Sequence, residues 1–331
     1  MNITIFGAGS FGTAAAVHLA LLGHNILIWT RRGAQAEQIN TAHTNDFCFT
    51  DTRLADTITA TNDMAAALAY SDRYILAIPT QSLRDVCGKL ASYSPKGGHM
   101  LNLAKGMEIS TGKLPHSICS ELCPQFTYSV LSGPSHAEEV ILNLPTTVAL
   151  ASRVDTEAKS WQDIMNGGNF RVYTATDVMG VETGGALKNI YAIAAGISRA
   201  LKLGDNALAA LASRGLAEIM RFGVKIGASP LTLSGLAGAG DLMVTCYSMH
   251  SRNFRLGLAI GHGKSLKDAA AELGQVAEGA YTVRAVIENS RRFGVEMPLA
   301  DAVYRVLYDG AEPHTVLKEL FARPPKPEMR L

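Results

Sequence analysis

The chain has 331 residues, of which 47% are hydrophobic and 18% are charged, and its formal net charge is +1. At about 150 residues per domain this length predicts two domains, and the hydrophobic content excludes intrinsic disorder. A net charge so close to zero argues against nucleic acid or an anionic membrane as a partner, and no apolar run reaches the roughly 18 to 20 residues of a membrane span, so we expect no stable membrane association.

From residue 2 to residue 173, short β-rich runs alternate with helical patterns. The first run follows Met1-Asn2, without a basic region or a cleavage site, so we expect no secretory signal and a cytoplasmic protein. The predicted strands are Ile3–Phe6, Asn25–Trp29, Ile58–Thr61, Tyr74–Ile78, Met100–Ala104, Tyr128–Leu131, Thr147–Leu150 and Phe170–Tyr173. The predicted helices lie at roughly 11–22, 63–70, 81–92, 112–122, 135–142 and 155–166. This alternation predicts an α/β domain with a mostly parallel sheet covered by helices on both faces.

After about Asp177 the pattern changes to long helical stretches rich in Ala, Leu and Gly. Examples are Gly184–Leu201, Ala207–Ile226 and Ala277–Phe293. The second domain is therefore predicted to be all-helical. We place the domains at residues 1–176 and 177–331.

A glycine-rich motif, Gly7-Ala8-Gly9-Ser10-Phe11-Gly12, separates the first strand from the first helix. In this position it predicts a Rossmann-type, doubly wound dinucleotide-binding domain, because each glycine has a mechanical role. Gly7 makes the tight turn, Gly9 admits the pyrophosphate to the backbone, and Gly12 allows close contact of helix and strand. A glycine turn without a ligand is the alternative.

The end of the second strand indicates which dinucleotide is bound. Proteins selective for NAD usually have an acidic residue here, facing the ribose 2′-hydroxyl. This sequence instead has Arg31 and Arg32, whose guanidinium groups suit a 2′-phosphate. We expect NADP(H) with NAD tolerated, against the alternative of an exposed basic loop.

Two lysines are candidates for the chemistry. Lys105 follows the fifth predicted strand on the side of the ligand crevice, where a solvent-facing lysine is the alternative. Lys188 lies in an apolar helical pattern, with Gly184 one turn before it, which we interpret as room for a substrate. Loss of hydration and a nearby like charge would lower its pKa toward values useful in acid–base catalysis, unless the side chain extends to solvent.

A second glycine-rich stretch, Gly235–Gly240, ends at Asp241. No predicted strand precedes it, so we exclude a second nucleotide loop. Asp241 either joins Lys188 or only caps the next helix. Arg252, between Ser251 and Asn253, suits a phosphate, with a solvated turn as the alternative.

Seven motifs occur in the order found in bacterial NAD(P)-dependent glycerol-3-phosphate dehydrogenase, which the chain resembles over nearly its whole length. They are Gly7–Gly12, Lys105-Gly106, Ser132–Ser135, Gly185–Asn189, Gly238–Leu242, Ser251–Asn253 and Gly274–Gly279. The resemblance implies interconversion of dihydroxyacetone phosphate and sn-glycerol 3-phosphate with NADP(H) or NAD(H) for phospholipid synthesis. It also implies a cytoplasmic homodimer.

Carried onto this sequence, the resemblance makes Lys188 the acid/base, with Asp241 and Lys105 beside it. The residues that it places at the cofactor are Gly7, Gly9, Ser10, Phe11, Gly12, Arg31, Lys105, Ala137, Arg252, Val276 and Glu278. Those that it places at the substrate are Lys105, Gly133, Ser135, Lys188, Asp241, Ser251, Arg252 and Asn253. Phe11 and Ser135 stand where relatives often have Tyr and Thr, so only their backbone contacts carry over unchanged.

Two rival functions remain at this point. A β-hydroxyacid dehydrogenase also combines a dinucleotide domain with a helical domain and a catalytic lysine, and Arg252 would then bind a carboxylate. A redox-sensing NADP(H)-binding module would need the glycine loop and Arg31, but no buried lysine. His136, near Ser135, is an alternative proton donor.

The five cysteines are odd in number, and Cys119 and Cys123 form a C-x-x-x-C rather than a zinc or redox C-x-x-C. In a cytosolic protein this predicts reduced structural thiols at Cys48, Cys87, Cys119, Cys123 and Cys246. We expect no metal.

Overall fold

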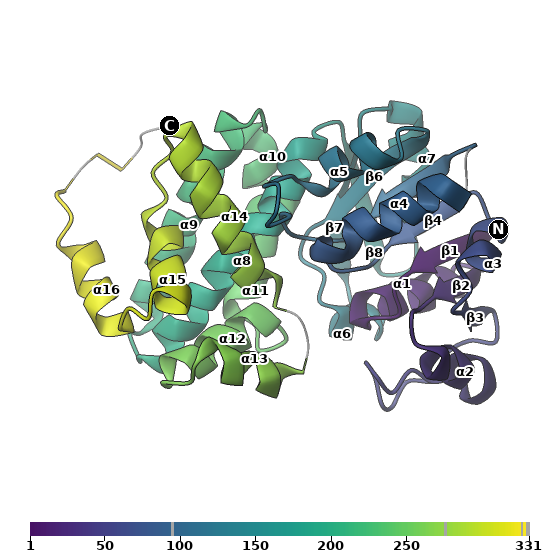
Figure 1. The fold of residues 1–331 in the computed structure, drawn as a ribbon, viewed down its shortest axis with the longest axis horizontal. Helices are drawn as coiled ribbons and strands as arrows, with labels where there is room; N and C mark the ends of the chain where they lie inside the picture. The colour runs from purple at the N-terminus through teal and green to yellow at the C-terminus, as the bar shows by residue number, and fades with distance from the viewer. Residues whose placement is uncertain (94–95, 275–276, 326, 329–331) are drawn as a thin grey trace. The chain divides into compact units, whose positions relative to one another are not determined.

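The computed structural model describes residues 1–93, 96–274, 277–325 and 327–328. Val276, which was expected at the cofactor, lies outside these described residues. The chain forms two compact units, which we call the sheet unit (Met1–Ala104 with Pro115–Val178) and the helical unit (Lys105–Leu114 with Met179–Leu331) (Figure 1). The domain boundary expected at 176/177 stays a prediction. The segment Lys105–Leu114 belongs to the helical unit by its contacts.

The sheet unit is built on eight strands in the order β3-β2-β1-β4-β5-β6-β7-β8. They are β1 (Asn2–Phe6), β2 (Asn25–Trp29), β3 (Ile58–Thr61), β4 (Arg73–Leu76), β5 (Gly98–Asn102), β6 (Phe126–Ser132), β7 (Thr146–Ser152) and β8 (Phe170–Ala175). All neighbours pair in parallel except β6 and β7, which are antiparallel. The predicted fold class is confirmed.

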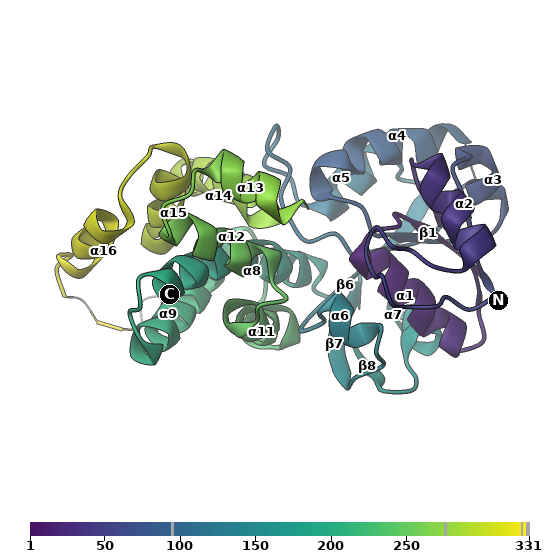
Figure 2. The same cartoon turned by 90° about the horizontal axis from the view of Figure 1, so that it is seen from below.

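Helices cover both faces of this sheet, as Figure 2 shows. Successive strand residues alternate between the two cores: Ile75 of β4 packs on one side, and Tyr74 and Leu76 on the other. The first core includes residues of α1 (Ser10–Leu21), α2 (Gly33–Ala42), α6 (Ala137–Val140) and α7 (Asp155–Met165). The second includes residues of α3 (Met64–Ala69), α4 (Leu83–Tyr93), which follows the 3₁₀ turn η1 (Thr80–Ser82), and α5 (Pro115–Leu122).

Two helices of the sheet unit differ from expectation. The helix α2 was not predicted, because only Gln35, Ala36 and Ile39 of its residues are buried and the apolar periodicity is weak. The helix expected from residue 112 begins only at Pro115, since proline suits the first helical position, where its missing N–H costs nothing.

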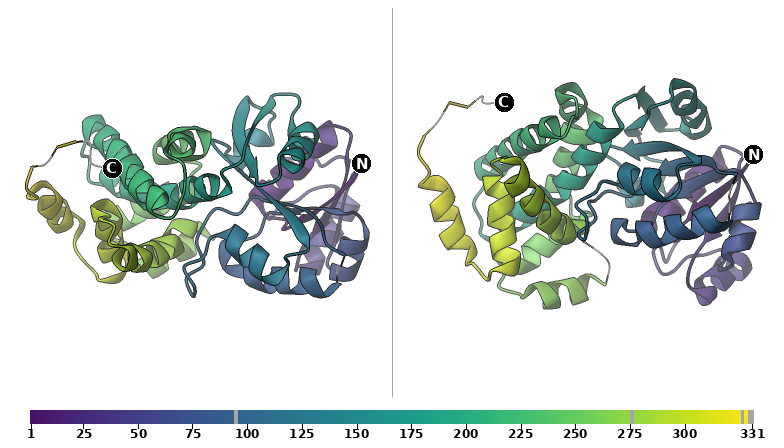
Figure 3. Two further views of the ribbon diagram at one scale, coloured as in Figure 1. Left: turned by 90° about the horizontal axis from the view of Figure 1, so that it is seen from above. Right: turned by 45° about the horizontal axis from the view of Figure 1, so that its top comes forward.

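The helical unit, whose helices run from teal to yellow in Figures 1 and 3, contains helices and no strand in the ranges that the structure describes. They are α8 (Val178–Ala200), α9 (Asp205–Lys225), α10 (Pro230–Ser234), the π-helical turn η2 (Leu236–Gly240), α11 (Asp241–Tyr247), α12 (Arg252–Gly261), α13 (Leu266–Leu273), α14 (Glu278–Phe293), α15 (Pro298–Tyr308) and α16 (Pro313–Phe321). The all-helical expectation is confirmed. Within the described residues, no helix has the length and apolarity needed to cross a membrane.

Candidate active site

The glycine loop of the sheet unit lies between β1 and α1 and has the predicted geometry. Gly7 has φ +117°, and a Cβ there would lie 2.3 Å from the carbonyl oxygen of Ala77. A Cβ on Gly12 would lie 2.0 Å from the carbonyl oxygen of Gly7, so only glycine allows this helix to approach the strand. Gly9 is exposed, and a Cβ there would meet nothing within 4 Å. The backbone at Gly9 is therefore open to a ligand.

The carbonyl of Ala8 is held from inside the sheet unit by three donors. The side-chain amides of Gln35 and Asn45 donate to it at 2.8 and 3.1 Å, and the thiol of Cys48 donates at 3.4 Å. The peptide bonds of the described chain are trans, so the N–H of Gly9 points away from this carbonyl. These side chains, which the sequence analysis did not single out, fix the loop with that N–H turned away from the core.

The N-terminus of α1 completes an anion-binding arrangement. Gly9 is the N-cap and provides no side-chain cap, and the first turn has no acidic residue. The N–H groups of the first turn and the positive end of the helix dipole therefore suit a pyrophosphate. Together with the open backbone at Gly9, this arrangement fits a dinucleotide. Ser10 is buried, and the half-buried ring of Phe11 packs against the neighbouring core.

The two arginines after β2 differ in their surroundings. Arg32 is the N-cap of α2, and its guanidinium lies 5.2 Å from the ring centre of Phe47. Arg31 is exposed and has no ion pair or hydrogen bond with the described residues. Its charge is therefore available to a 2′-phosphate, whereas Arg32 already stacks on an aromatic ring.

A second loop of the sheet unit follows β6. Gly133 has φ +138°, and a Cβ there would lie 3.0 Å from the Cα atom of Val148, which explains the glycine. The Ser135 hydroxyl donates to the carbonyl of Gly133 at 2.9 Å. Ala137 begins α6, and His136 precedes it as the N-cap, without a side-chain capping bond. The roles expected for these residues stay predictions.

In the helical unit, Lys188, Lys105 and Asp241 form one charged cluster. Lys188, on α8, donates to Oδ1 of Asp241 and, at 2.8 Å, to the hydroxyl of Thr245. Lys105 donates to Oδ2 of the same carboxylate at 2.7 Å. Asp241 is fully buried and Lys188 is 6% exposed. Two ammonium groups on one carboxylate leave a net positive charge, which suits an anionic substrate.

Burial and the neighbouring charges shift both titrating groups. Burial lowers the pKa of Lys188 to about 8; Asp241 opposes this shift and Lys105 adds to it. Burial alone would raise the pKa of Asp241, but the two ammonium groups outweigh it and hold the pKa below its usual value. Asp241 is thus an anion, and Lys188 can gain or lose a proton near neutral pH.

Gly184 explains how Asp241 reaches Lys188. A Cβ at Gly184 would lie 2.4 Å from the carbonyl oxygen of Ala237, so the backbone of η2 occupies the space that a side chain would need. This corrects our interpretation of Gly184 as room for a substrate. The close approach instead places Asp241, at the start of α11, beside Lys188. Asp241 is not the helix cap, because Gly240 occupies that position.

Buried amides link the cluster to two further helices. Asn189 donates to the carbonyl of Lys105 at 3.3 Å and accepts a 3.0 Å bond from Asn253 on α12. Asn253 in turn accepts a 2.9 Å bond from the backbone N–H of Gly279, at the start of α14. Asn189, which was not among the predicted site residues, is therefore part of the arrangement. Asn253 thus has a positioning role, holding Asn189 and the N–H of Gly279, in addition to the substrate contact predicted for it.

The predicted phosphate-binding residues lie at helix starts. Ser251 is the N-cap of α12, and its hydroxyl accepts a 3.2 Å bond from the N–H of Phe254. Arg252, half-buried, is the first residue of that helix, and half-buried Glu278 is the first residue of α14. Thr245, one turn after Asp241, was missed, although its i, i+4 spacing was a usable signal.

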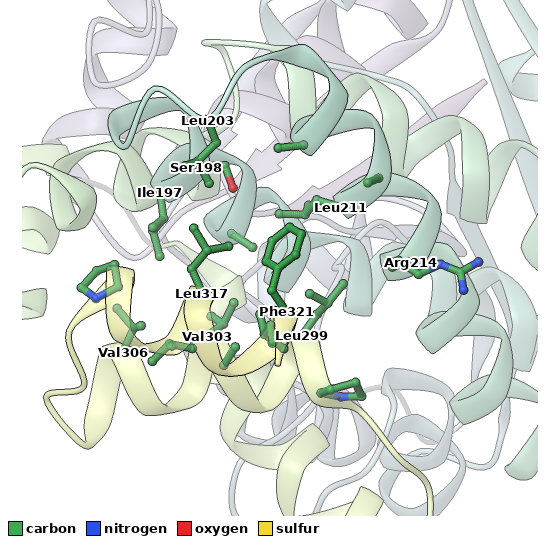
Figure 4. Close-up of a pocket in the computed structure, with 18 of the residues that line it drawn as sticks. Ile197, Ser198, Leu203, Leu211, Arg214, Leu299, Val303, Val306, Leu317 and Phe321 are labelled. Carbon is green, nitrogen blue, oxygen red and sulfur yellow. The ribbon is translucent and has the colours of Figure 1, made fainter. Parts of the chain in front are cut away.

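The helical unit also has a cavity of about 460 Å³, shown in Figure 4. Its lining is mostly aliphatic, with side chains such as Leu211, Val303 and Leu317, and Lys105, Lys188 and Asp241 do not line it. Its charged lining residues are Arg214, Glu218, Arg221 and Arg323, and no lysine lines it. The Glu218 carboxylate already accepts bonds from the Tyr191 hydroxyl and from the N–H groups of Leu299 and Ala300. We therefore place the candidate chemistry at the lysine cluster.

Two family models match the chain. The model described as NAD-dependent glycerol-3-phosphate dehydrogenase N-terminus matches residues 2–158, and the corresponding C-terminus model matches residues 177–318. Together they extend over both units.

Individual relatives agree with these models. A glycerol-3-phosphate dehydrogenase (NAD(P)+) of Geobacillus thermodenitrificans is 46% identical, over 99% of this chain and 96% of its own length. One from Staphylococcus aureus is 44% identical, over 99% of both chains. The crystal structure of glycerol-3-phosphate dehydrogenase from Coxiella burnetii is 36% identical, with a TM-score of 0.94 over 97% of this chain and 99% of that one.

Proposed function

The chain belongs to the NAD-dependent glycerol-3-phosphate dehydrogenase family, and from this premise we propose that Lys188 is its proton-transfer group. The protein is an oxidoreductase that interconverts dihydroxyacetone phosphate and sn-glycerol 3-phosphate with NAD(H) or NADP(H). The resemblance seen in the sequence is confirmed, and the two rival classes, a hydroxyacid dehydrogenase and a non-catalytic sensor, are set aside.

The residues assigned to the cofactor and those assigned to the substrate overlap at Lys105 and Arg252. Gly7, Gly9, Gly12 and the first turn of α1 hold the dinucleotide pyrophosphate, and Arg31 pairs with the 2′-phosphate of NADP(H). The bound cofactor supplies or accepts the hydride. Further cofactor contacts expected from the family fall on Ser10, Phe11, Lys105, Ala137, Arg252 and Glu278. Substrate contacts are assigned to Lys105, Gly133, Ser135, Lys188, Asp241, Ser251, Arg252 and Asn253.

The observation that carries the proposal is the geometry around the Nζ atom of Lys188. Asp241 and Thr245 hold this atom, while burial brings the pKa to about 8. During ketone reduction the C2 carbonyl oxygen becomes an alkoxide, and the Lys188 ammonium donates a proton to it. In the oxidative direction the neutral amine accepts the hydroxyl proton. Lys105 stays on the other oxygen of Asp241 and stabilises the developing negative charge.

Replacement of Lys188 tests this assignment. Lys188→Ala should lower kcat by about 10²- to 10⁴-fold, while NADPH binding, measured by fluorescence titration, is retained. Lys188→Arg keeps the charge beside Asp241 but cannot release a proton near neutral pH, so it should remain equally slow. Lys225→Ala, an exposed change on α9, is the matched control.

Recovery of most of the activity in Lys188→Arg would show that only the charge matters and would contradict proton transfer by Lys188. A folded Lys188→Ala variant whose kcat stays within about twofold of the parent would move the role to Lys105 or His136. A small exogenous amine should partly restore Lys188→Ala, and it should restore Lys105→Ala less.

We propose that residues 1–176 act as the dinucleotide-binding domain and residues 177–331 as the substrate domain. We also propose a cytoplasmic homodimer that supplies glycerol 3-phosphate for phospholipid synthesis. Its mass in solution, measured by light scattering, tests the dimer: a monomer at micromolar concentration would contradict it.

A further inference from the structure

Three cysteines meet in the core of the sheet unit, in the face of the sheet covered by α4 and α5. Cys87 lies on α4, Cys119 on α5, and Cys123 directly after the last residue of α5. All three are buried, and their sulfur atoms lie within 4.8 Å of one another. The sulfur atoms of Cys87 and Cys119 are 3.6 Å apart.

This cluster was not visible in the sequence. The spacing of Cys119 and Cys123 alone was the reason to expect no metal, and Cys87 stands 32 positions before Cys119. The fold adds the third sulfur by packing α4 against α5. Cys119 and Cys123 are held one helical turn apart by a 2.8 Å bond from the N–H of Cys123 to the carbonyl of Cys119. Two of the three sulfur positions are therefore set by a hydrogen-bonded backbone.

The size of the sulfur triangle suits a metal ion. A zinc–sulfur bond is about 2.3 Å, which places three coordinating sulfurs roughly 3.8 to 4.0 Å apart. The observed triangle needs only small side-chain adjustments to reach these separations. A disulfide would instead need two sulfurs at about 2.05 Å and would leave the third unused. Three thiolates together select soft ions over magnesium or calcium.

We propose that Cys87, Cys119 and Cys123 form a three-thiolate site for Zn²⁺ that joins α4 to α5, each thiol releasing its proton to solvent as its sulfur binds the ion. A cavity of about 110 Å³ touches Cys119 and Cys123 and also has Ser120 and Tyr128 in its lining. It has room for the water molecule that completes four-coordinate zinc at sites with three protein ligands. Arg84 lies one turn before Cys87 on α4, and its guanidinium donates to Glu121 of α5 at 3.1 Å. The Arg84–Glu121 ion pair therefore joins the same two helices as the cysteines.

The role of this site is structural. An ion that binds only the folded sheet unit stabilises it by mass action. The three cysteines are not among the residues assigned to cofactor or substrate, so binding should leave kcat and KM unchanged. Its effect should appear as resistance to unfolding.

Metal titration of the whole, untagged protein tests the proposal. After reduction and chelator treatment, the parent should bind one equivalent of Zn²⁺ in a calorimetric titration, and its Tm should rise by several degrees. Cd²⁺ should give the ultraviolet thiolate-to-metal charge-transfer absorption in the parent. Cys87→Ser and Cys119→Ser should each lose the Tm shift and most of the absorption.

Cys48→Ser is the matched control, because Cys48 lies outside the cluster; it should bind the ion like the parent. Should Cys119→Ser fail to fold, Cys123→Ser and the thiolate absorption of the parent decide the question. The absence of stoichiometric binding in the reduced parent would overturn the proposal. Unchanged binding in the cluster variants would do the same, because the ion would then lie elsewhere.

Discussion

The side-chain amide of Gln35 lies 2.8 Å from the carbonyl oxygen of Ala8, inside the glycine loop. Gln35 belongs to α2, a helix that follows the loop by one strand, and its other amide atom accepts a 2.8 Å bond from the hydroxyl of Thr30. One buried side chain therefore connects the end of β2, near Arg31, with the loop that would hold the pyrophosphate.

Replacement of Gln35 should weaken cofactor binding. Gln35→Leu removes the shortest of the three bonds to the Ala8 carbonyl and also the 2.9 Å bond to Asn45, so the N–H of Gly9 is held less firmly in its direction. A lost buried hydrogen bond costs about 1–3 kcal/mol, so the Kd values for NADPH and NADH should rise together. Fluorescence titration measures both. Gln38→Leu on the same helix is the control, since Gln38 bonds Asp46 instead. Unchanged affinity in Gln35→Leu would contradict this role.

Arg31 should set the preference between the two cofactors. Arg31→Ala removes a charge-assisted contact worth roughly 1.5–3 kcal/mol, so KM for NADPH should rise about 10- to 100-fold while that for NADH changes little. Arg32→Ala is the comparison, because Arg32 already stacks on Phe47 and should have a smaller effect. Equal changes in KM for NADPH and NADH in Arg31→Ala would contradict the assignment of Arg31 to the 2′-phosphate.

The rate of dihydroxyacetone phosphate reduction should fall above about pH 8. Lys188 must be protonated to donate, and burial lowers its pKa to about 8, so the competent fraction decreases as pH rises through this value. The oxidative rate should rise over the same range, because it needs the neutral amine. Lys105→Met removes a like charge and should move both midpoints upward. A reductive profile without a fall up to about pH 9.5 would contradict the assignment.

Arg252 should recognise the substrate phosphate. Arg252→Ala should raise KM for dihydroxyacetone phosphate by roughly 10- to 100-fold, as expected for loss of a charge-assisted contact. Cofactor affinity should change less. Unphosphorylated dihydroxyacetone should be a poor substrate for the parent, and a panel of 3-oxo acids should show no significant NADPH consumption. Efficient turnover of dihydroxyacetone would show that the enzyme does not require the substrate phosphate for recognition.

Gly184→Ala tests the close approach of α8 and η2. The new Cβ would lie 2.4 Å from the carbonyl oxygen of Ala237, so η2 must move and carry Asp241 with it. Such overpacking costs about 1–3 kcal/mol, which lowers Tm. Because Asp241 raises the pKa of Lys188, the pH midpoint of reduction should also shift downward. Gly88→Ala, where a Cβ meets nothing within 4 Å, is the control. An unchanged midpoint would mean that Asp241 had not moved.

The fold was predictable wherever the signal is local. The βαβ order and the roles of Gly7 and Gly12 follow from periodicity and from the sterics of a tight turn. The helix α2 has no comparable apolar pattern, and tertiary contacts hold it: Gln35 bonds Ala8 and Asn45, and Ala36 and Ile39 pack into the core.

The candidate site was predictable in its chemistry and less so in its geometry. The apolar surroundings of Lys188 indicated a lowered pKa. Its partner remained open, because Asp241 lies 53 positions away and capping was an equally local interpretation. The error at Gly184 has the same origin: a glycine on a helix shows that space is needed but not what fills it. Only the fold shows that backbone, rather than substrate, lies there.

The short segment Lys105–Leu114 leaves the sheet unit and returns to it, so three chain crossings join the two units. Met107 and Leu114, in this segment, belong to the core of the helical unit. During synthesis they would remain exposed until the C-terminal helices emerge. A split or a recombination point at 176/177 would also separate Lys105 from Lys188 and Asp241. A chimera joined to a relative at 176/177 would take Lys105 from one parent and Lys188 and Asp241 from the other. Transferring Lys105–Leu114 together with the helices would keep all three residues from the same parent.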